Sequence, residues 1–236
     1  MSLLRDADLA NAFDHASRTY DRMTSASPGY HAHLLRSARR LCLPGAGAGM
    51  SVLDLGCGTG ASTAALLRAA PLATLTGVDA SAGMLARARL KEWPAQVSFV
   101  HAPVERMPPR ADAPGSHDAV FAAYLFRNVS DPDETLGAVH RLLRPGGRLA
   151  VHEYALSGRV LHRVLWTTVM RGLVRPWGRL NGDGALYAHL HRSVLDFDTA
   201  AEFVDRIRRA GFTRVRCLPL PGWQTGITHT FVAERR

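Results

Sequence analysis

Five short apolar runs alternate with segments of helical periodicity between residues 51 and 154, and this alternation limits the fold more than any other feature of the chain. Strands that alternate with helices make right-handed crossovers, which produce a mostly parallel sheet with helices on both faces. The predicted strands are 51–55, 73–79, 97–102, 118–124 and 144–154, and the predicted helices are 61–70, 81–93 and 131–143. Ser81 is placed to cap the second of these helices. We therefore expect an α/β fold.

Charge and composition limit the class of function. The formal net charge is +9, from 28 Arg and 1 Lys against 20 acidic residues. The Arg residues are scattered without interleaved aromatic residues, so the charge does not predict a nucleic-acid partner. No run of about 18 apolar residues and no signal-peptide segment is present, so we expect no integral membrane association. Three widely spaced cysteines without a CxxC pair favour the reducing cytoplasm over a disulfide framework or a zinc site.

The sequence VLDLGCGTG, residues 52–60, leads from the first predicted strand through a glycine loop into a helix. Gly56, Gly58 and Gly60 allow a tight turn and let a ligand approach bare backbone beside the positive end of the helix dipole. Dinucleotide-binding loops have the spacing GxGxxG. Because this loop has GxGxG, it disfavours NAD and FAD.

Two acidic residues indicate what the loop binds instead. Asp54 precedes the loop and can hold an ammonium group directly or through water, and Asp79 ends the second strand, where it can accept both hydroxyls of a ribose. A ligand with an amino-acid end, a ribose and no phosphate fits this set, and S-adenosylmethionine is such a ligand. A tight turn over a buried acid is the purely structural alternative.

Together with GVDASAGML, residues 77–85, the glycine loop resembles the class I S-adenosylmethionine-dependent methyltransferases. The resemblance implies a Rossmann-like, seven-stranded, mostly parallel sheet of order 3-2-1-4-5-7-6, with the last strand antiparallel. It also implies S-adenosylmethionine as cofactor, bound by Asp54, Gly56, Cys57, Gly58, Thr59, Gly60, Asp79, Ala80, Met84, Val104 and Ala123.

Two of these positions carry an alternative or a departure from the family. Met84 either packs on the adenine face or only fills the core. Relatives have Asp or Asn where this chain has Pro103, which offers no side-chain acceptor to the adenine amine. The neighbouring Val104 N–H can still donate to the ring, so one hydrogen bond is lost, at a cost of about 1 kcal/mol.

Residues 124–154, YLFRNVSDPDETLGAVHRLLRPGGRLAVHEY, are similar to the C-methyltransferases of ubiquinone and menaquinone biosynthesis, including the Arg-Asn-Val stretch. The segments FDHASRTYD (13–21) and 186–233 extend this similarity over nearly the whole chain. The resemblance implies methyl transfer from S-adenosylmethionine to a small aromatic or quinonoid acceptor, with a ring carbon favoured as the methylated atom.

The predicted elements form a single methyltransferase domain over residues 1–236, a length that suits one sizeable core. We divide it into a helical N-terminal cover at 1–43, a cofactor-binding core at 50–154, a helical lid at 156–195, and a closing helix with two strands at 198–236.

The sulfonium methyl group is already activated, so catalysis consists mainly of alignment, and a carbon acceptor needs ionisation of a neighbouring hydroxyl. Arg127 follows the fourth strand, at the sheet edge where ligands bind in such folds, and its guanidinium can stabilise the oxyanion. The resemblance also places a matching Arg near the acceptor. A structural Arg that pairs with Asp131 or a helix end is the alternative, and Asn128 either braces this turn or only forms it.

Several residues are candidates for a base or for a cover over the cofactor. His152 and Tyr154 end the fifth strand, while His15 and Tyr20 lie in the N-terminal cover. His189 and His191, another histidine pair, are two residues apart in a predicted helix. Their side chains do not share a face, so we expect no metal site.

Residues 159–180, RVLHRVLWTTVMRGLVRPWGRL, combine helical apolar spacing with several arginines. Two interpretations stay open. The segment either packs on the sheet as a lid that lines the acceptor pocket, or makes a weak contact with a membrane surface that suits a lipophilic quinone. The sequence also leaves open whether the chain forms a homo-oligomer.

These features predict a cytoplasmic enzyme that methylates a small aromatic or quinonoid molecule. The change at Pro103 and the divergent lid favour a specialised relative, such as an enzyme of secondary metabolism. The alternatives are an O- or N-methyltransferase of a small natural product, an RNA methyltransferase, and an S-adenosylmethionine-binding protein that catalyses a cyclisation without methyl transfer.

Overall fold

The computed structural model describes residues 6–27, 29–107, 113–180 and 182–236. Its centre is a seven-stranded sheet of order β3-β2-β1-β4-β5-β7-β6. The strands are β1 (Ser51–Leu55), β2 (Thr74–Asp79), β3 (Val97–His101), β4 (His117–Ala123), β5 (Leu143–Tyr154), β6 (Phe212–Pro219) and β7 (Thr228–Arg235). β7 is antiparallel to β5 and β6, and the other neighbours are parallel. The predicted strand order and the antiparallel last strand are confirmed.

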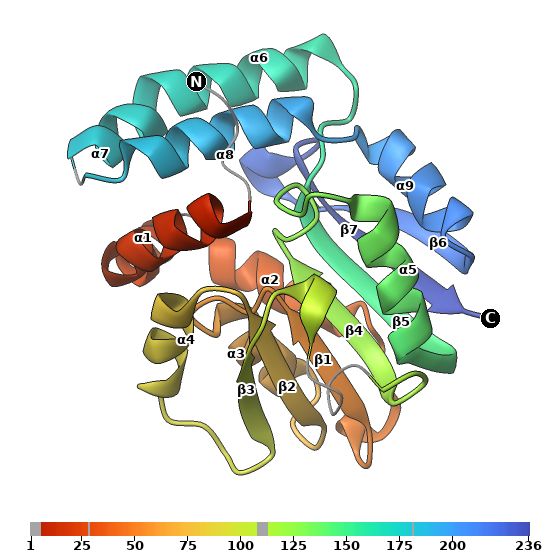
Figure 1. Cartoon of the computed structure of the whole chain (residues 1–236). Helices are drawn as coiled ribbons and strands as arrows, with labels where there is room; N and C mark the ends of the chain where they lie inside the picture. The colour runs from red at the N-terminus through yellow and green to blue at the C-terminus, as the bar shows by residue number, and fades with distance from the viewer. Residues whose placement is uncertain (1–5, 28, 108–112, 181) are drawn as a thin grey trace.

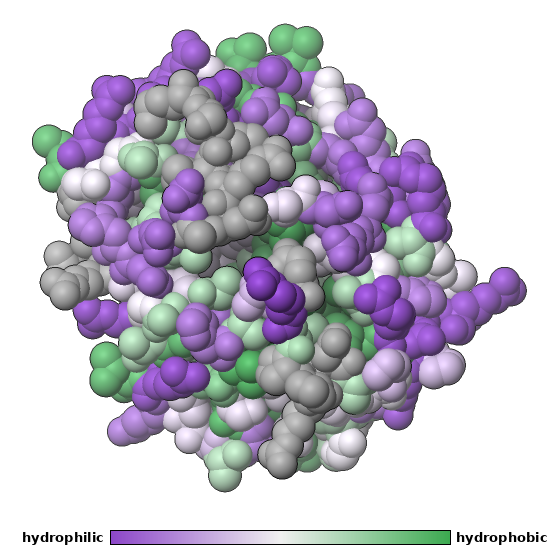
Figure 2. Space-filling model, viewed as in Figure 1, coloured by the Kyte–Doolittle hydropathy of each residue, from purple (hydrophilic) through white to green (hydrophobic). Residues whose placement is uncertain are grey.

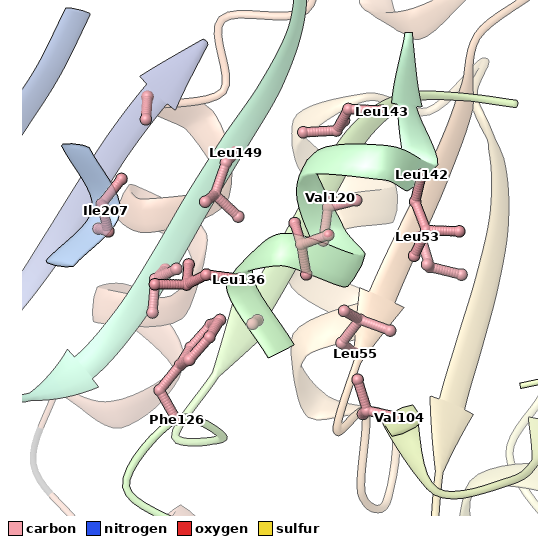
Figure 3. Close-up of a cluster of buried hydrophobic side chains, with 14 of the residues drawn as sticks. Leu53, Leu55, Val104, Val120, Phe126, Leu136, Leu142, Leu143, Leu149 and Ile207 are labelled. Carbon is pink, nitrogen blue, oxygen red and sulfur yellow. The ribbon is translucent and has the colours of Figure 1, made fainter. Parts of the chain in front are cut away.

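Helices pack on both faces of this sheet (Figure 1). The α-helices of the described chain are α1 (Asp6–Ala26), α2 (Tyr30–Arg39), α3 (Ala61–Ala69), α4 (Ala82–Arg89), α5 (Pro132–Leu142), α6 (Val160–Val169), α7 (Arg175–Leu180), α8 (Gly184–Asp196) and α9 (Ala200–Arg209). One apolar cluster joins α2 and α3 to the sheet, and another joins α5 and α9 to its opposite face. Figure 3 shows the second cluster, in which Leu136 and Leu142 of α5 lie over Val120 of β4 and Leu53 of β1.

The helix starts follow local sequence signals. The Ser81 hydroxyl accepts from Met84 N at 3.0 Å, as the sequence predicts, and Asp131 accepts from the backbone N–H groups of Asp133 and Glu134, both at 2.9 Å. Such caps satisfy N–H groups that have no partner within the helix. The helix predicted over 81–93 ends at Arg89, because the chain turns so that the Trp93 indole donates to the carbonyl of Ala88 at 2.7 Å.

Helices α1, α6, α7 and α8 lie beyond the carboxyl ends of the parallel strands (Figure 1), whereas α4 packs beside β2 and β3. α1 contacts α4 and α8, while α6 and α7 are joined by a π-helical turn, Met170–Val174, into one long helix. α7 packs closely on α8, since a Cβ built on Gly178 would lie 2.0 Å from Tyr187 Cδ2. Within the described residues, no helix has the length and hydropathy needed to cross a bilayer.

Candidate functional site

A cleft of about 750 Å³ lies at the carboxyl ends of β1, β2 and β4, under α1. This is the edge at which open α/β sheets bind ligands. Its described lining includes, from the predicted cofactor set, Gly56, Gly58, Asp79, Ala80, Met84, Val104 and Ala123, and, from the predicted catalytic set, Arg127 and Asn128. The structure therefore brings part of each predicted set into one cleft.

The three loop glycines have different surroundings, although all have positive φ values of 69°, 55° and 86°. A Cβ on Gly60 would lie 2.7 Å from the Trp93 ring, and one on Gly56 would lie 3.2 Å from Leu125 Cδ1. A Cβ on Gly58 would meet nothing within 4 Å. Gly60 is therefore required by packing, whereas Gly58 leaves open space over the backbone on the side where a ligand can approach.

Asp79 is held rigidly at the edge of the cleft. Its carboxylate accepts from Gly58 N at 2.7 Å and from Ser81 N at 2.8 Å, one bond to each oxygen. Burial raises its pKa, and these two backbone hydrogen bonds oppose that rise. Because each carboxylate oxygen has a second lone pair, Asp79 can still accept from a vicinal diol.

Asp54 lies beneath the loop and is absent from the described lining of the cleft. Its Oδ2 accepts from the hydroxyls of Ser62 and Thr63, both at 2.7 Å, while its Oδ1 is buried without a hydrogen-bond partner in the described structure. Burial raises the pKa of this carboxyl to about 7. The geometry favours an indirect interaction with a bound ammonium group, through the loop or a water, over a direct contact.

Three other predicted cofactor residues have distinct places. Cys57 is buried, and its N–H donates to the carbonyl of Val78 at 3.1 Å, which ties the loop to β2. Met84 is buried in α4 and lines the cleft. Thr59 is also buried, and its hydroxyl donates to Asp21 of α1 at 2.5 Å, so it anchors the cover over the cleft.

Two aspartates hold α1 over the cleft, and the sequence reasoning missed their role. Asp21 also pairs with Lys91 at 2.9 Å, and Asp14 accepts from Gly83 N at 2.8 Å and from the Ser81 hydroxyl. Asp14 thus supports the start of α4 next to Asp79. Both lie in the segment FDHASRTYD, whose two Asp residues were the available signal.

Arg127 forms a buried ion pair with Glu153, a residue that the sequence reasoning also missed. Its Nη1 lies 2.7 Å from Glu153 Oε1 and donates to the carbonyl of Tyr124 at 2.8 Å. The two side chains are 7% and 0% exposed. Burial raises the pKa of Glu153, and Arg127 is the largest influence that lowers it. Arg127 therefore forms its ion pair with Glu153 and not with Asp131, and this pair joins the ends of β4 and β5.

Aromatic rings surround this ion pair. The Arg127 guanidinium lies 5.4 Å from the Tyr124 ring centroid and 5.5 Å from that of Tyr154. Tyr124 stacks on Tyr154 at 4.7 Å and on Tyr30 at 6.0 Å, and Tyr154 packs on Trp166 of α6 at 5.0 Å. Tyr124 lines the cleft with φ at 58°, a strained value for a non-glycine residue that is often found at functional sites.

His152 is buried behind the cleft with both ring nitrogens engaged. Its Nδ1 bonds to the Ser37 hydroxyl and its Nε2 to the Tyr124 hydroxyl, each at 2.8 Å. Burial lowers its pKa to about 3. The structure thus places His152 as a neutral support for Tyr124. It is not among the described residues that line the cleft, and Tyr154 also lies behind Tyr124 in the stack.

The lid contacts a residue of the cleft wall, Asn128, through a histidine that the sequence analysis set aside. His189 of α8 bonds through Nε2 to Asn128 Oδ1 at 3.0 Å, and Asn128 donates to the carbonyl of Tyr124 at 2.9 Å. Burial, and then Arg127, lower the pKa of His189 to about 4. The side chain of Asn128 therefore braces the turn, which is one of the two roles that the sequence left open. No described residue of 156–195 lines the cleft, contrary to the expectation for the lid.

Two expectations have no structural test. The side chain of Tyr20 lies outside the described part of α1, so its assignment to the cover is untested. Among the described residues, no group of three or more potential metal ligands comes together, and the expectation of a metal-free site stays a prediction.

Comparison with known proteins decides the family. The profile of the ubiE/COQ5 methyltransferase family matches residues 1–231. This chain belongs to the ubiE/COQ5 methyltransferase family. The ubiquinone/menaquinone biosynthesis C-methyltransferase UbiE of Syntrophotalea carbinolica is 35% identical over 190 residues, which are 80% of this chain and 78% of that protein. The demethylmenaquinone methyltransferase of Mycolicibacterium paratuberculosis is 32% identical over 229 residues, 97% and 94% of the two chains.

A solved structure supports the fold of this ubiE/COQ5 family member. The S-adenosylmethionine-dependent methyltransferase of Thermotoga maritima, described as a possible histamine N-methyltransferase, superposes with a TM-score of 0.69 at 19% identity and covers 97% of this chain and 100% of its own. The chain is an S-adenosylmethionine-dependent methyltransferase. The open space over Gly58, the fixed carboxylate of Asp79 and a cleft volume within the usual range for small-molecule sites fit this cofactor.

Proposed function

We propose that the chain methylates a ring carbon of a small quinonoid acceptor in its reduced, hydroxyl-bearing form. The observation that carries the proposal is the position of Arg127, which lies in the same cleft as the loop of Gly58 and is flanked by aromatic rings. The names of the two relatives, which refer to ubiquinone or menaquinone biosynthesis and to demethylmenaquinone, support this class of acceptor.

In this proposal the chain binds the cofactor with residues at both ends of the cleft. Gly56 and Gly58 would face the methionine part, Asp79 would accept the ribose hydroxyls, and Met84 with Val104 would enclose the adenine. The cofactor supplies an activated methyl group on a sulfonium. The contribution of the protein is to hold that group in line with the acceptor carbon and to exclude water with α1.

Arg127 would make the acceptor carbon nucleophilic. A guanidinium that stays protonated near an acceptor hydroxyl stabilises the ionised form that remains when the hydroxyl proton passes to water, and the negative charge is shared with the neighbouring ring carbons. The bound cofactor would supply its methyl group to that carbon, and its sulfur would keep the electron pair of the broken bond. The ring carbon finally loses its proton to water, which restores the aromatic ring.

Glu153 would have a positioning role in this scheme. It fixes Nη1 of Arg127 at 2.7 Å and is itself fully buried, so it sets where the guanidinium points. An Arg already paired with a carboxylate has less net charge to offer. The aromatic faces of Tyr124 and Tyr154 partly offset this, because they keep water away from the remaining N–H groups.

The test is to incubate the protein with methyl-labelled S-adenosylmethionine and a panel of short-chain naphthoquinols, benzoquinols, phenols and amines. We expect label in the quinols, located on a ring carbon by mass spectrometry and NMR. D79A is the control, with impaired cofactor binding and hence little product. Label only on oxygen or nitrogen, or cofactor binding without turnover of any quinol, would contradict the proposal.

A further inference from the structure

Exposed hydrophobic side chains are concentrated on the long helix formed by α6, the π-helical turn and α7. Ten large hydrophobic residues are exposed in the described structure, and seven of them lie within residues 160–180. Six of these form what we call the lid face: Val160, Leu161, Val164, Leu173, Trp177 and Leu180. Leu161 and Leu173 are each 70% exposed, and Leu180 is 86% exposed.

The lid face is a second apolar face on a helix that already has one. The inner side of the helix carries Trp166 and Met170, which are buried against Leu156, Val194 and Ile227. A surface helix of a globular protein needs only one apolar stripe for packing. The outer face is therefore not explained by the fold of the single chain, and exposed apolar surface of this kind marks an interaction site.

Positive charge flanks the lid face. Five arginines lie in the sequence from Ala155 to Gly182, namely Arg159, Arg163, Arg171, Arg175 and Arg179, with no Asp or Glu. None of the five forms an ion pair with any residue that the structure describes. In the orientation of Figure 1, hydrophobic surface stands among hydrophilic side chains at the upper edge of the molecule (Figure 2).

We propose that the lid face docks on an anionic lipid surface. Exposed leucine, valine and tryptophan side chains between unpaired arginines are the combination that binds the interface of such a membrane. A second copy of this chain fits less well, because pairing the face with itself would bring five arginines against five arginines. An acidic protein partner would match the charge and is treated as an outcome of the test.

The position of the lid face connects docking to the site, and this step rests on the proposed function. Trp166, on the inner side of α6, packs on Tyr154, which stacks on Tyr124 of the cleft. One helix thickness, about 10 Å, therefore separates the lid face from the aromatic stack. A quinonoid acceptor with an apolar tail could keep that tail in the lipid while its ring reaches the cleft.

The test measures co-sedimentation of the full chain with vesicles of phosphatidylcholine alone and of phosphatidylcholine mixed with phosphatidylglycerol. We expect binding to the mixed vesicles that weakens as salt is added, and little binding to the neutral ones. The variant L161E/L173E should lose about tenfold or more in affinity for the mixed vesicles. The matched control is L72E/L90E, at positions 61% and 77% exposed and away from the lid, which should bind as the wild type does.

Three results would overturn the inference. The wild type would fail to bind anionic vesicles, or both double variants would lose the same vesicle affinity. The third is that L161E/L173E changes its oligomeric state by light scattering but keeps its vesicle binding. If the wild type sediments with vesicles only while an acidic protein co-purifies with it, and no longer does so once that protein is removed, the lid face would be assigned to the protein partner. Turnover of a water-soluble quinol without vesicles separates the two proposals. L161E/L173E should retain it, and its absence in the wild type would count against the proposed function alone.

Discussion

Removal of Arg127 offers the sharpest test of how the site is built. In the variant R127A, Glu153 keeps its fully buried position but loses the only ion-pair partner that it has among the described residues. Breaking a buried pair from one side costs about 3–5 kcal/mol, because an uncompensated charge remains inside. At about 2–4 °C per kcal/mol for a chain of this size, the melting temperature should fall by about 6–20 °C.

Two further variants separate the charge from the loss of packing. R127M/E153Q removes both charges while keeping much of the side-chain volume, so it should recover most of the stability lost in R127A. R208A is the control for a surface pair, since Arg208 and Asp205 are 58% and 60% exposed. Its loss should stay below about 1 kcal/mol.

The pH dependence gives an independent check on the same reasoning. Burial already raises the pKa of Glu153, and removal of Arg127 removes the largest influence that lowers it. Between the ordinary carboxyl pKa and this raised value, the folded state binds more protons than the unfolded state, so stability falls as pH rises. The deficit of R127A should therefore be larger at pH 8 than at pH 5.

Thermal unfolding by fluorimetry and urea unfolding of the four proteins at both pH values would measure these effects. A melting temperature for R127A within about one degree of the wild type would refute the description of a buried, mutually dependent pair. The same conclusion would follow if R127M/E153Q were as unstable as R127A, because the stranded charge would then not be the cause.

Three further predictions concern the cofactor and the lid. G58A should weaken S-adenosylmethionine binding while lowering stability by only about 1–2 kcal/mol of backbone strain. G60A, whose Cβ would lie 2.7 Å from Trp93, should mainly lower the melting temperature. Equal effects of the two variants on binding by calorimetry and on melting by fluorimetry would refute the distinction. D79A should weaken cofactor binding by about 1–3 kcal/mol, the scale of lost charge-assisted hydrogen bonds, and unchanged calorimetric affinity would remove the ribose assignment. His189, with its pKa lowered to about 4 by burial, is held neutral when folded, so stability should fall as pH drops from about 6.5 to 4. Urea unfolding of H189N should show a shallower fall in that window, and an equal slope would contradict this role of His189.

Local sequence signals were enough to predict the frame of the cofactor site. The glycine spacing at 56–60 and the pair of Asp79 and Ser81 each belong to one short segment, so each signal can be read without tertiary information. The sequence signal was weaker for Glu153, the ion-pair partner of Arg127. Glu153 is a charged residue within the apolar strand LAVHEYAL, which was a signal for a buried partner, but nothing local indicated which one.

The sequence by itself determined the succession of strands and helices, the glycine loop and the turn that carries Arg127, because alternating periodicity and loop spacing are properties of short segments. The strand order followed from the resemblance to the methyltransferase family and not from periodicity. Only the tertiary structure decided the contacts between segments. β4 and β5 lie side by side with Ala123 opposite His152, and this register brings Arg127 to Glu153. The same packing of distant elements brings His189 to Asn128, 61 residues away. Which face of α6 packs inward was likewise settled by its neighbours, since both of its faces are apolar.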